Sequence, residues 1–276
     1  MKYKNQHTVS QTYLKEWCDH LTPQGQEPYV WVVSKDGTGI ANKAPKNVFS
    51  ESDFYTVYDE AGNRNTQLEH ELHNIEDDYV QVRAAIKDHK PIDDEGMLKL
   101  VSYISTSYAR TQYQKSDQGL IWEELIGIYQ SLGINEHMPA LYSQVERLRD
   151  QPMPFMLTNF MRLTVPVLMK MNLTILETSR RKGFITSDNP VLWIDPSLLI
   201  PGFPLTFFGL DSPLLEILFP ISPNQLTSLT WSGSEQYIFI DADQQMVNEV
   251  NKLIVSWSSE SVILNHNQPK PYWFET

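Results

Sequence analysis

The sequence predicts an α+β fold with short N-terminal strands, a central helical layer, a mostly antiparallel C-terminal sheet and a final amphipathic helix. Strand-like runs occupy the start of the chain, a helical spacing of apolar residues begins near residue 65, and strand-like runs return after residue 173. Strands, then helices, then strands without regular alternation is the order typical of α+β proteins. The 276 residues suffice for one large domain or two smaller ones. We expect a single domain over 1–276, helical over about 65–172 and mainly β over about 173–276.

The N-terminal strands are predicted from two stretches in which aromatic and β-branched residues precede turn residues. "EPYVWVVSKDG" ends in Asp36-Gly37, a pair typical of hairpin turns, and "SDFYTVYDEAGN" repeats the pattern. We therefore expect short strands separated by turns and irregular chain in this region.

The first long helix is predicted from "TQLEHELHNIEDDYVQVRAAIK". Its apolar residues recur at spacings of three and four and form one buried stripe: Leu68, Leu72, Ile75, Tyr79, Val82 and Ile86. A rotation of about 100° per residue places Glu69, Glu76 and Arg83 together at one edge of this stripe. These three side chains are therefore expected beside the core and not on the opposite, solvated face.

A second helix, expected over about 94–115, contains an uncharged run from Leu100 to Ala109 that is followed by Arg110. A helix without charge on any face is normally covered on most sides. Arg110 then points into or beside a packed layer, where an arginine needs a carboxylate or several carbonyl groups as partners.

The rest of the chain is predicted as helices followed by strands. Helices are expected at about 117–132 and 137–149, and "PFMLTNFMRLTVPVLMKMN" predicts a largely apolar helix interrupted at Pro166. Strands follow in "LTILETS", "GFITSD", "PVLWI", "LEILFPIS", "LTSLTW" and "YIFID". A last amphipathic helix places on its stripe Met246, Val250, Leu253, Ile254 and Trp257, and "SVILN" ends the regular structure. Residues 195–213 are rich in proline and glycine and predict a long loop.

Net charge, cysteine content and the lack of long apolar runs indicate which substrates and which compartment suit this protein. Lys and Arg number 22 against 34 Asp and Glu, which gives a net charge of −12 and weakens, without excluding, a nucleic-acid substrate. The single cysteine, Cys18, allows no internal disulfide and fits a reducing compartment. No apolar run approaches the ~20 residues that span a bilayer, and the N-terminus lacks the apolar core of a signal peptide. We expect a cytoplasmic protein without a membrane segment.

The established short motifs are missing. The sequence contains no GxxxxGK[ST] loop, GxGxxG turn, GxSxG elbow or CxxC pair, so no nucleotide-cofactor motif is present. "HELH" at 70–73 spaces its histidines by three, whereas the zinc-peptidase helix requires four. Cys18 without an identified base is more typical of a small packing residue than of a nucleophile.

Six separated stretches carry a recognisable set of motifs: "HTVSQTYLKEW" (7–17), "NVFSESDFY" (47–55), "LEHELHNIE" (68–76), "TSYARTQ" (106–112), "FITSDNPV" (184–191) and "LFPISP" (218–223). In this order, over nearly the whole chain, they resemble the bacterial family called domain of unknown function 4238. The family pattern is matched by His7, Val9, Tyr13, Leu14, Glu69, Leu72, Glu76, Arg110 and Thr186–Pro190. Ser10 stands where the pattern has proline, which allows a less rigid first turn. The resemblance implies a shared fold and a shared polar site, and it implies no particular reaction.

The polar residues of these motifs are the candidate catalytic residues: His7, Glu76, Arg110, Asp188 and Asn189. Imidazole and carboxylate groups transfer protons, and a guanidinium stabilises developing negative charge. The candidate metal ligands, for Mg²⁺ or Mn²⁺, are Glu69, Glu76 and Asp188. Glu69 and Glu76 lie ~10 Å apart along one helix, so a metal site requires Asp188 to join one of them.

Each candidate also has a structural interpretation. Asp188-Asn189-Pro190 is good turn chemistry, because Asp and Asn bond their own backbone and the residue before proline prefers extended geometry. Glu69 and Glu76 could be solvated acids or partners of Arg83 and Arg110. His7 could simply fix the N-terminus. A meeting of Arg110, Glu76 and Asp188 in one cleft would favour the functional interpretation for all of them.

Two functions therefore remain open. The first is a hydrolase or nuclease-like enzyme of accessory or defence type, with or without the assistance of a metal ion, acting on a small molecule or a nucleic acid. The second is a non-catalytic protein or small-molecule binder, in which the polar residues form a structural network. Its contact surface would be the aromatic loop at 201–210, "PGFPLTFFGL", since exposed aromatic residues often contact partners.

Overall fold

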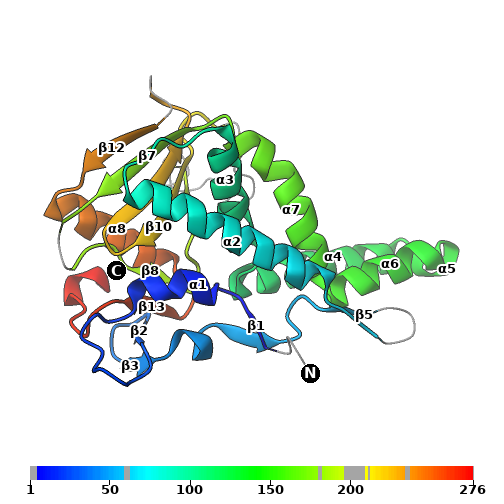
Figure 1. The fold of residues 1–276 in the computed structure, drawn as a ribbon. Helices are drawn as coiled ribbons and strands as arrows, with labels where there is room; N and C mark the ends of the chain where they lie inside the picture. Colours follow the sequence, from blue (N-terminus) through cyan, green and yellow to red (C-terminus); the bar gives the residue numbers. More distant parts are fainter. Residues whose placement is uncertain are drawn as a thin grey trace.

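The computed structural model describes residues 5–58, 63–179, 182–195, 209–210, 212–233 and 237–275. Helices and several small sheets share one chain (Figure 1), which confirms the predicted α+β class. The predicted aromatic loop, with Phe203, Phe207 and Phe208, lies outside the described residues except for residues 209 and 210. Within the described part of the chain, no helix is both long and apolar enough to cross a membrane.

The N-terminal region forms a two-stranded ribbon and supplies two of the four strands of a second sheet. Strand β1 (Asn5–His7) pairs antiparallel with β4 (Ser50–Ser52), and His7 lies opposite Ser50. Along the sequence, three short helices lie between the two strands of this ribbon: α1 (Gln11–Leu14), η1 (Lys15–Trp17) and η2 (Pro45–Asn47). A second small ribbon pairs β5 (Val57–Tyr58) with β6 (Arg64–Asn65).

The second sheet corrects the expectation that the late strands form one C-terminal sheet. Its order is β3-β2-β13-β8, with strands β3 (Ile40–Lys43), β2 (Val30–Ser34), β13 (Ser261–Leu264) and β8 (Thr186–Ser187). Two strands from the last hundred residues therefore complete an N-terminal hairpin. The stretch "GFITSD", expected as a full strand, contributes only the two residues of β8.

The larger sheet has the order β12-β7-β11-β10-β9. Its strands are β12 (Tyr237–Asp241), β7 (Asn172–Glu177), β11 (Gln225–Thr230), β10 (Glu216–Ser222) and β9 (Leu192–Ile194). All neighbours are antiparallel except β12 and β7, which run parallel, in agreement with the mostly antiparallel expectation.

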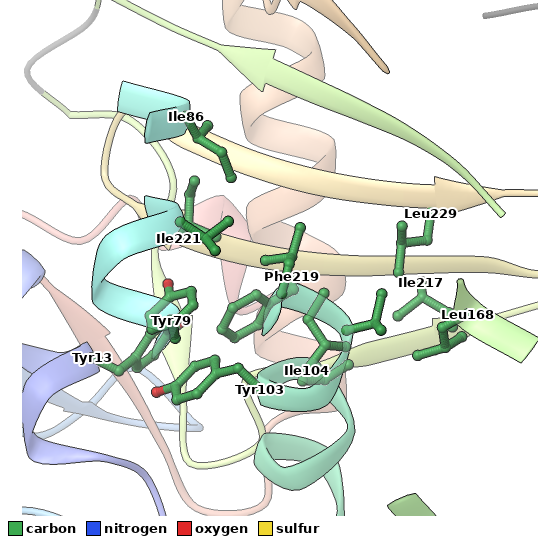
Figure 2. Packing of buried hydrophobic residues seen from close by; sticks show 14 of the residues in the cluster. Tyr13, Tyr79, Ile86, Tyr103, Ile104, Leu168, Ile217, Phe219, Ile221 and Leu229 are labelled. Atoms are coloured by element: carbon green, nitrogen blue, oxygen red, sulfur yellow. The ribbon is translucent and has the colours of Figure 1, made fainter. Parts of the chain in front are cut away.

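Successive side chains of β10 point to opposite faces of this sheet, and helices pack against both faces. Ile217, Phe219 and Ile221 belong to the core shared with α2 (Gln67–Lys87) and α3 (Asp94–Ala109), whereas Leu218 packs in the core formed with the amphipathic helix α8 (Gln244–Trp257). Figure 2 shows Tyr13, Tyr79 and Tyr103 around Phe219. The Tyr79 and Tyr103 rings stack with centroids 3.7 Å apart and fix the crossing of α2 over α3.

The helical layer differs from expectation at two points. The helix expected over 94–115 ends at Ala109, because Thr111 caps a new helix, α4 (Gln112–Ser131), by accepting the amide hydrogen of Gln114. Pro166 does not interrupt its helix but lies within α7 (Pro152–Leu168), two residues from the end. The remaining helices are α5 (Ile134–His137) and α6 (Pro139–Asp150), and Figure 1 shows α4, α5 and α6 projecting from the rest of the molecule.

Candidate functional site

The end of α3 places Arg110 in a polar cluster against α2. Arg110 is 1% exposed and donates through Nη1 to Oε1 of Glu76 at 2.7 Å. The Glu76 side chain keeps 18% of its surface exposed. Burial alone would lower the pKa of Arg110, but the Glu76 carboxylate raises it above its ordinary value. Arg110 is therefore a fixed buried cation, and the predicted pairing with Glu76 is present.

Glu69 lies two turns earlier on the same edge of α2 and meets a residue that the sequence did not single out. The hydroxyl of the buried Tyr55 bonds to the Glu69 carboxylate, and Gln6 of β1 accepts the Tyr55 amide hydrogen at 2.8 Å. Burial raises the pKa of Glu69, and the neighbouring Glu76 charge adds to the increase. The neutral form of Glu69 is thus favoured more than in a solvated glutamate.

His7 at the end of β1 completes the cluster. Burial lowers the pKa of its imidazole below the ordinary 6.5, and the Arg110 charge acts in the same direction. A hydrogen bond with the Lys46 backbone and the Glu76 charge oppose this decrease without cancelling it. His7 is therefore a neutral base at pH 7.

Four atoms of this cluster are buried without a hydrogen-bond partner. They are Nε2 of His7, Oε2 of Glu69, and Nε and Nη2 of Arg110. An unpaired buried polar atom costs about 1–3 kcal/mol, and native proteins rarely keep several together unless a ligand, a water molecule or a reaction uses them. His7, Glu69 and Glu76 are each only partly buried, so the cluster is in contact with solvent on their side.

Asp188 and Asn189 are held elsewhere. The Asp188 carboxylate accepts the amide hydrogens of Ser259, Glu260 and Ser261 at 2.8, 2.6 and 3.0 Å. Asn189 donates to the carbonyl oxygen of Trp257 at 3.2 Å. The two side chains thus fasten the turn before β9 to the connection between α8 and β13. This is the structural interpretation considered above, because both side chains bond backbone groups at the end of α8 and in the segment that leads into β13.

The proposed metal-ligand set is not assembled. Across the described residues, no group of three or more His, Cys, Asp or Glu side chains is placed to hold a metal ion, so Glu69, Glu76 and Asp188 do not form one. Arg83, considered as a partner of Glu69 and Glu76, instead pairs with Glu16 at 2.8 Å. The site that the structure does assemble comprises His7, Glu69, Glu76 and Arg110, with Tyr55 added.

Tyr55 could have been found from the sequence, because it ends the stretch "NVFSESDFY". The signal was weak, since an aromatic residue in a predicted strand is more often part of the core. Only the pairing of β1 with β4, together with the Gln6 bond, carries this tyrosine to Glu69.

Comparison with known proteins places the chain in a family. No curated protein and no solved structure matched it. A family model described as "Protein of unknown function (DUF4238)" matches residues 5–268, a span that contains every residue of the polar cluster. The chain is a member of the DUF4238 family.

Proposed function

We propose that this protein is a hydrolase that cleaves an ester at the cluster of His7, Glu69 and Arg110. The observation that carries the proposal is that an imidazole nitrogen, a carboxyl oxygen and part of a guanidinium are buried without partners, in residues close enough to Arg110 and Glu76 for their charges to interact. A base, an acid and an anion-binding group are the components that ester hydrolysis requires.

The residues have distinct roles in this proposal. Nε2 of His7 takes a proton from water, the water oxygen attacks the phosphorus or carbonyl carbon, and Arg110 stabilises the oxyanion that develops. The bond to the leaving oxygen breaks as Glu69 in its neutral form donates a proton to that oxygen. Glu76 is a positioning residue, because its bond to Nη1 orients the guanidinium. Tyr55 positions Glu69 in the same way.

A divalent cation, Mg²⁺ or Mn²⁺, remains part of the proposal. Glu69 and Glu76 are ~10 Å apart along α2, so only one of these partly exposed carboxylates would serve as the protein's oxygen ligand to the ion. Substrate oxygens and water would have to complete the coordination, because Asp188 is engaged by three backbone amides. Assays with added Mg²⁺ or Mn²⁺ and with a chelator test this part separately.

Glu69→Gln is expected to lower kcat by about 100-fold, since removal of a general acid typically costs 10²–10⁴-fold. The rate of the unchanged protein is expected to fall at low pH, below 6.5, where the His7 base with its lowered pKa becomes protonated. It is also expected to fall as the pH rises above the pKa of Glu69, which burial raises, because the neutral form of Glu69 is the acid. Initial rates on chromogenic phosphate diesters, phosphate monoesters and carboxyl esters between pH 5 and 9 measure these effects.

Glu71→Ala is the control for that experiment, as Glu71 lies on an exposed face of the same helix. Equal rates for Glu69→Gln and Glu71→Ala on every ester turned over would remove Glu69 from the mechanism. A rate that does not decrease toward the acidic end of this pH range would remove His7 as the base.

A second candidate, partner binding, is favoured by the surface of α4. One face of this helix exposes Leu120 and Ile128 at 72% and 47%, followed by Leu132 at 66%. Asp117 and Glu124 lie on the same face, because successive residues of the stripe 117, 120, 124, 128 and 132 are three or four positions apart. Two copies of this face would bring acidic groups together, so its charge fits a basic amphipathic helix of another protein and not a second copy of this chain.

Leu120→Ser combined with Leu132→Ser is expected to weaken binding of a leucine–lysine amphipathic peptide at least tenfold while changing the melting temperature little, because both side chains are exposed. Fluorescence anisotropy at 150 mM salt measures binding, with a leucine–glutamate peptide as control. Equal affinity of the variant, equal binding of the acidic peptide, or a concentration-dependent dimer of this chain would each contradict this candidate.

A further inference from the structure

We infer that Arg110 binds a singly charged oxyanion side-on, through Nε and Nη2, and that the ligand of this site is a small phosphodiester. The inference rests on the proposed hydrolase function and adds to it the class of substrate. It depends on which edge of the guanidinium is free, on the charges around that edge, and on the charge of the whole protein.

The free edge of Arg110 has the geometry of a two-oxygen receptor. A guanidinium carries five N–H groups in one plane, and Nε–H and Nη2–H point in parallel from the same edge. Glu76 occupies Nη1, whereas Nε and Nη2 have no partner and are buried. Two parallel N–H groups match two oxygens of one carboxylate or phosphate group and hold them in a fixed orientation.

The surroundings favour an anion of one charge. Arg110 supplies the positive charge of the cluster, and the Glu76 carboxylate, with Oε1 2.7 Å from Nη1 of Arg110, already neutralises that charge. His7 lies close enough for the charges of Arg110 and Glu76 to act on it, but it adds no charge of its own at pH 7. A phosphate monoester, with a charge of about −1.5 to −2, would therefore meet more repulsion from Glu76 than a diester, which carries −1. Both unesterified oxygens of a diester can face the guanidinium edge.

The size of the ligand is limited by the rest of the protein. The net charge of −12 repels a long polyanion, because each added phosphate brings repulsion that a single buried arginine does not offset. His7, Glu69 and Glu76 around Arg110 are partly buried, and the cluster itself contains no basic side chain besides Arg110 and the uncharged His7. A short or cyclic diester fits these conditions better than a nucleic-acid strand.

The test uses the full chain and three probes at equal ionic strength: dimethyl phosphate, phenyl phosphate and acetate. We expect dimethyl phosphate to raise the melting temperature most, with sodium chloride as the reference. Arg110→Lys keeps the charge but loses the parallel N–H groups, so it should weaken dimethyl phosphate binding at least about tenfold. Arg83→Lys is the matched control, because Arg83 pairs with Glu16 outside the cluster, and it should bind as the unchanged protein does.

A measurement on the unchanged protein keeps the inference testable even if Arg110→Lys does not fold. Dimethyl phosphate should shift one slowly exchanging arginine Nε–H signal in ¹⁵N NMR, because the Nε of Arg110 is buried. No shift with any probe, or equal losses in Arg110→Lys and Arg83→Lys, overturns the inference. If acetate binds more strongly than dimethyl phosphate, the inferred phosphodiester ligand is wrong and the site prefers a carboxylate. If phenyl phosphate binds more strongly than dimethyl phosphate, the argument that the site prefers a single negative charge is wrong.

The same probes separate this inference from the proposed hydrolase function. Binding of dimethyl phosphate that depends on Arg110, without hydrolysis of any of the phosphate or carboxyl esters tested, would support the anion site and contradict the hydrolase. Hydrolysis that depends on Glu69 but has the same KM in Arg110→Lys would support the hydrolase and contradict the anion site.

Discussion

Replacement of Glu76 by alanine is expected to lower the free energy of unfolding by about 3–5 kcal/mol, the usual cost of breaking a buried ion pair. The substitution removes the carboxylate and leaves Arg110, only 1% exposed, as a buried cation with no ionic partner. The guanidinium cannot lose its proton to escape this cost. Urea unfolding at pH 7, followed by circular dichroism, measures the change.

Glu71→Ala provides the matched comparison, because it changes the same residue type on the exposed side of the same helix. We expect it to alter stability by less than about 0.5 kcal/mol. A loss in Glu76→Ala no greater than that in Glu71→Ala would mean that Arg110 is solvated or paired differently. The double variant Glu76→Ala with Arg110→Met should recover part of the loss, since it removes the unpaired charge.

Gly183→Ala is expected to lower the free energy of unfolding by about 3 kcal/mol, at the upper end of typical overpacking costs. An added Cβ would lie 1.9 Å from the carbonyl oxygen of Pro223, which is backbone and cannot rotate away. That oxygen already accepts the amide hydrogen of Phe184 at 2.8 Å, and Asn251 donates to the carbonyl oxygen of Gly183 at 2.9 Å. Relief of the clash therefore requires movement of the bonded segment that leads into β8.

Gly119→Ala is the control for this substitution. Gly119 lies inside α4, where an added Cβ would meet nothing within 4 Å. We expect this change to stabilise the protein by about 0.5–1 kcal/mol, because alanine loses less backbone entropy in a helix. Thermal and urea unfolding of both variants should give shifts of opposite sign. A Gly183→Ala protein at least as stable as the unchanged protein would show that the close approach at Pro223 is absent in solution.

The helices were the most predictable part of this fold. The apolar spacing of α2 placed Glu69 and Glu76 correctly at the edge of a buried stripe, and the uncharged run in α3 correctly placed Arg110 in a packed layer. The break after Ala109 was missed, although Thr111 is a good capping residue. Propensity within the stretch favoured one continuous helix, and the cap outweighed it.

The roles of Asp188 and Asn189 were less predictable. Their residue types suit both a turn and a site, so the local sequence left both interpretations open. The outcome depends on the amides of Ser259, Glu260 and Ser261, more than 70 positions further along the chain. Tyr55 entered the cluster for a similar reason, because its position follows from strand pairing and not from its own neighbours.

Neighbouring residues along the chain determined which faces of the helices are buried, since a period of 3.6 residues depends on one or two turns. Folding in three dimensions determined the partners. Glu76, 34 positions before Arg110, became its carboxylate, and β13 returned to pair with β2, where Val262 lies opposite Val33. A side chain or strand with several chemically equivalent partners is assigned by the packing of distant segments, because local composition does not distinguish among them. The candidate residues could therefore be named from their chemistry, but their separation into a polar cluster and a structural turn follows from long-range contacts.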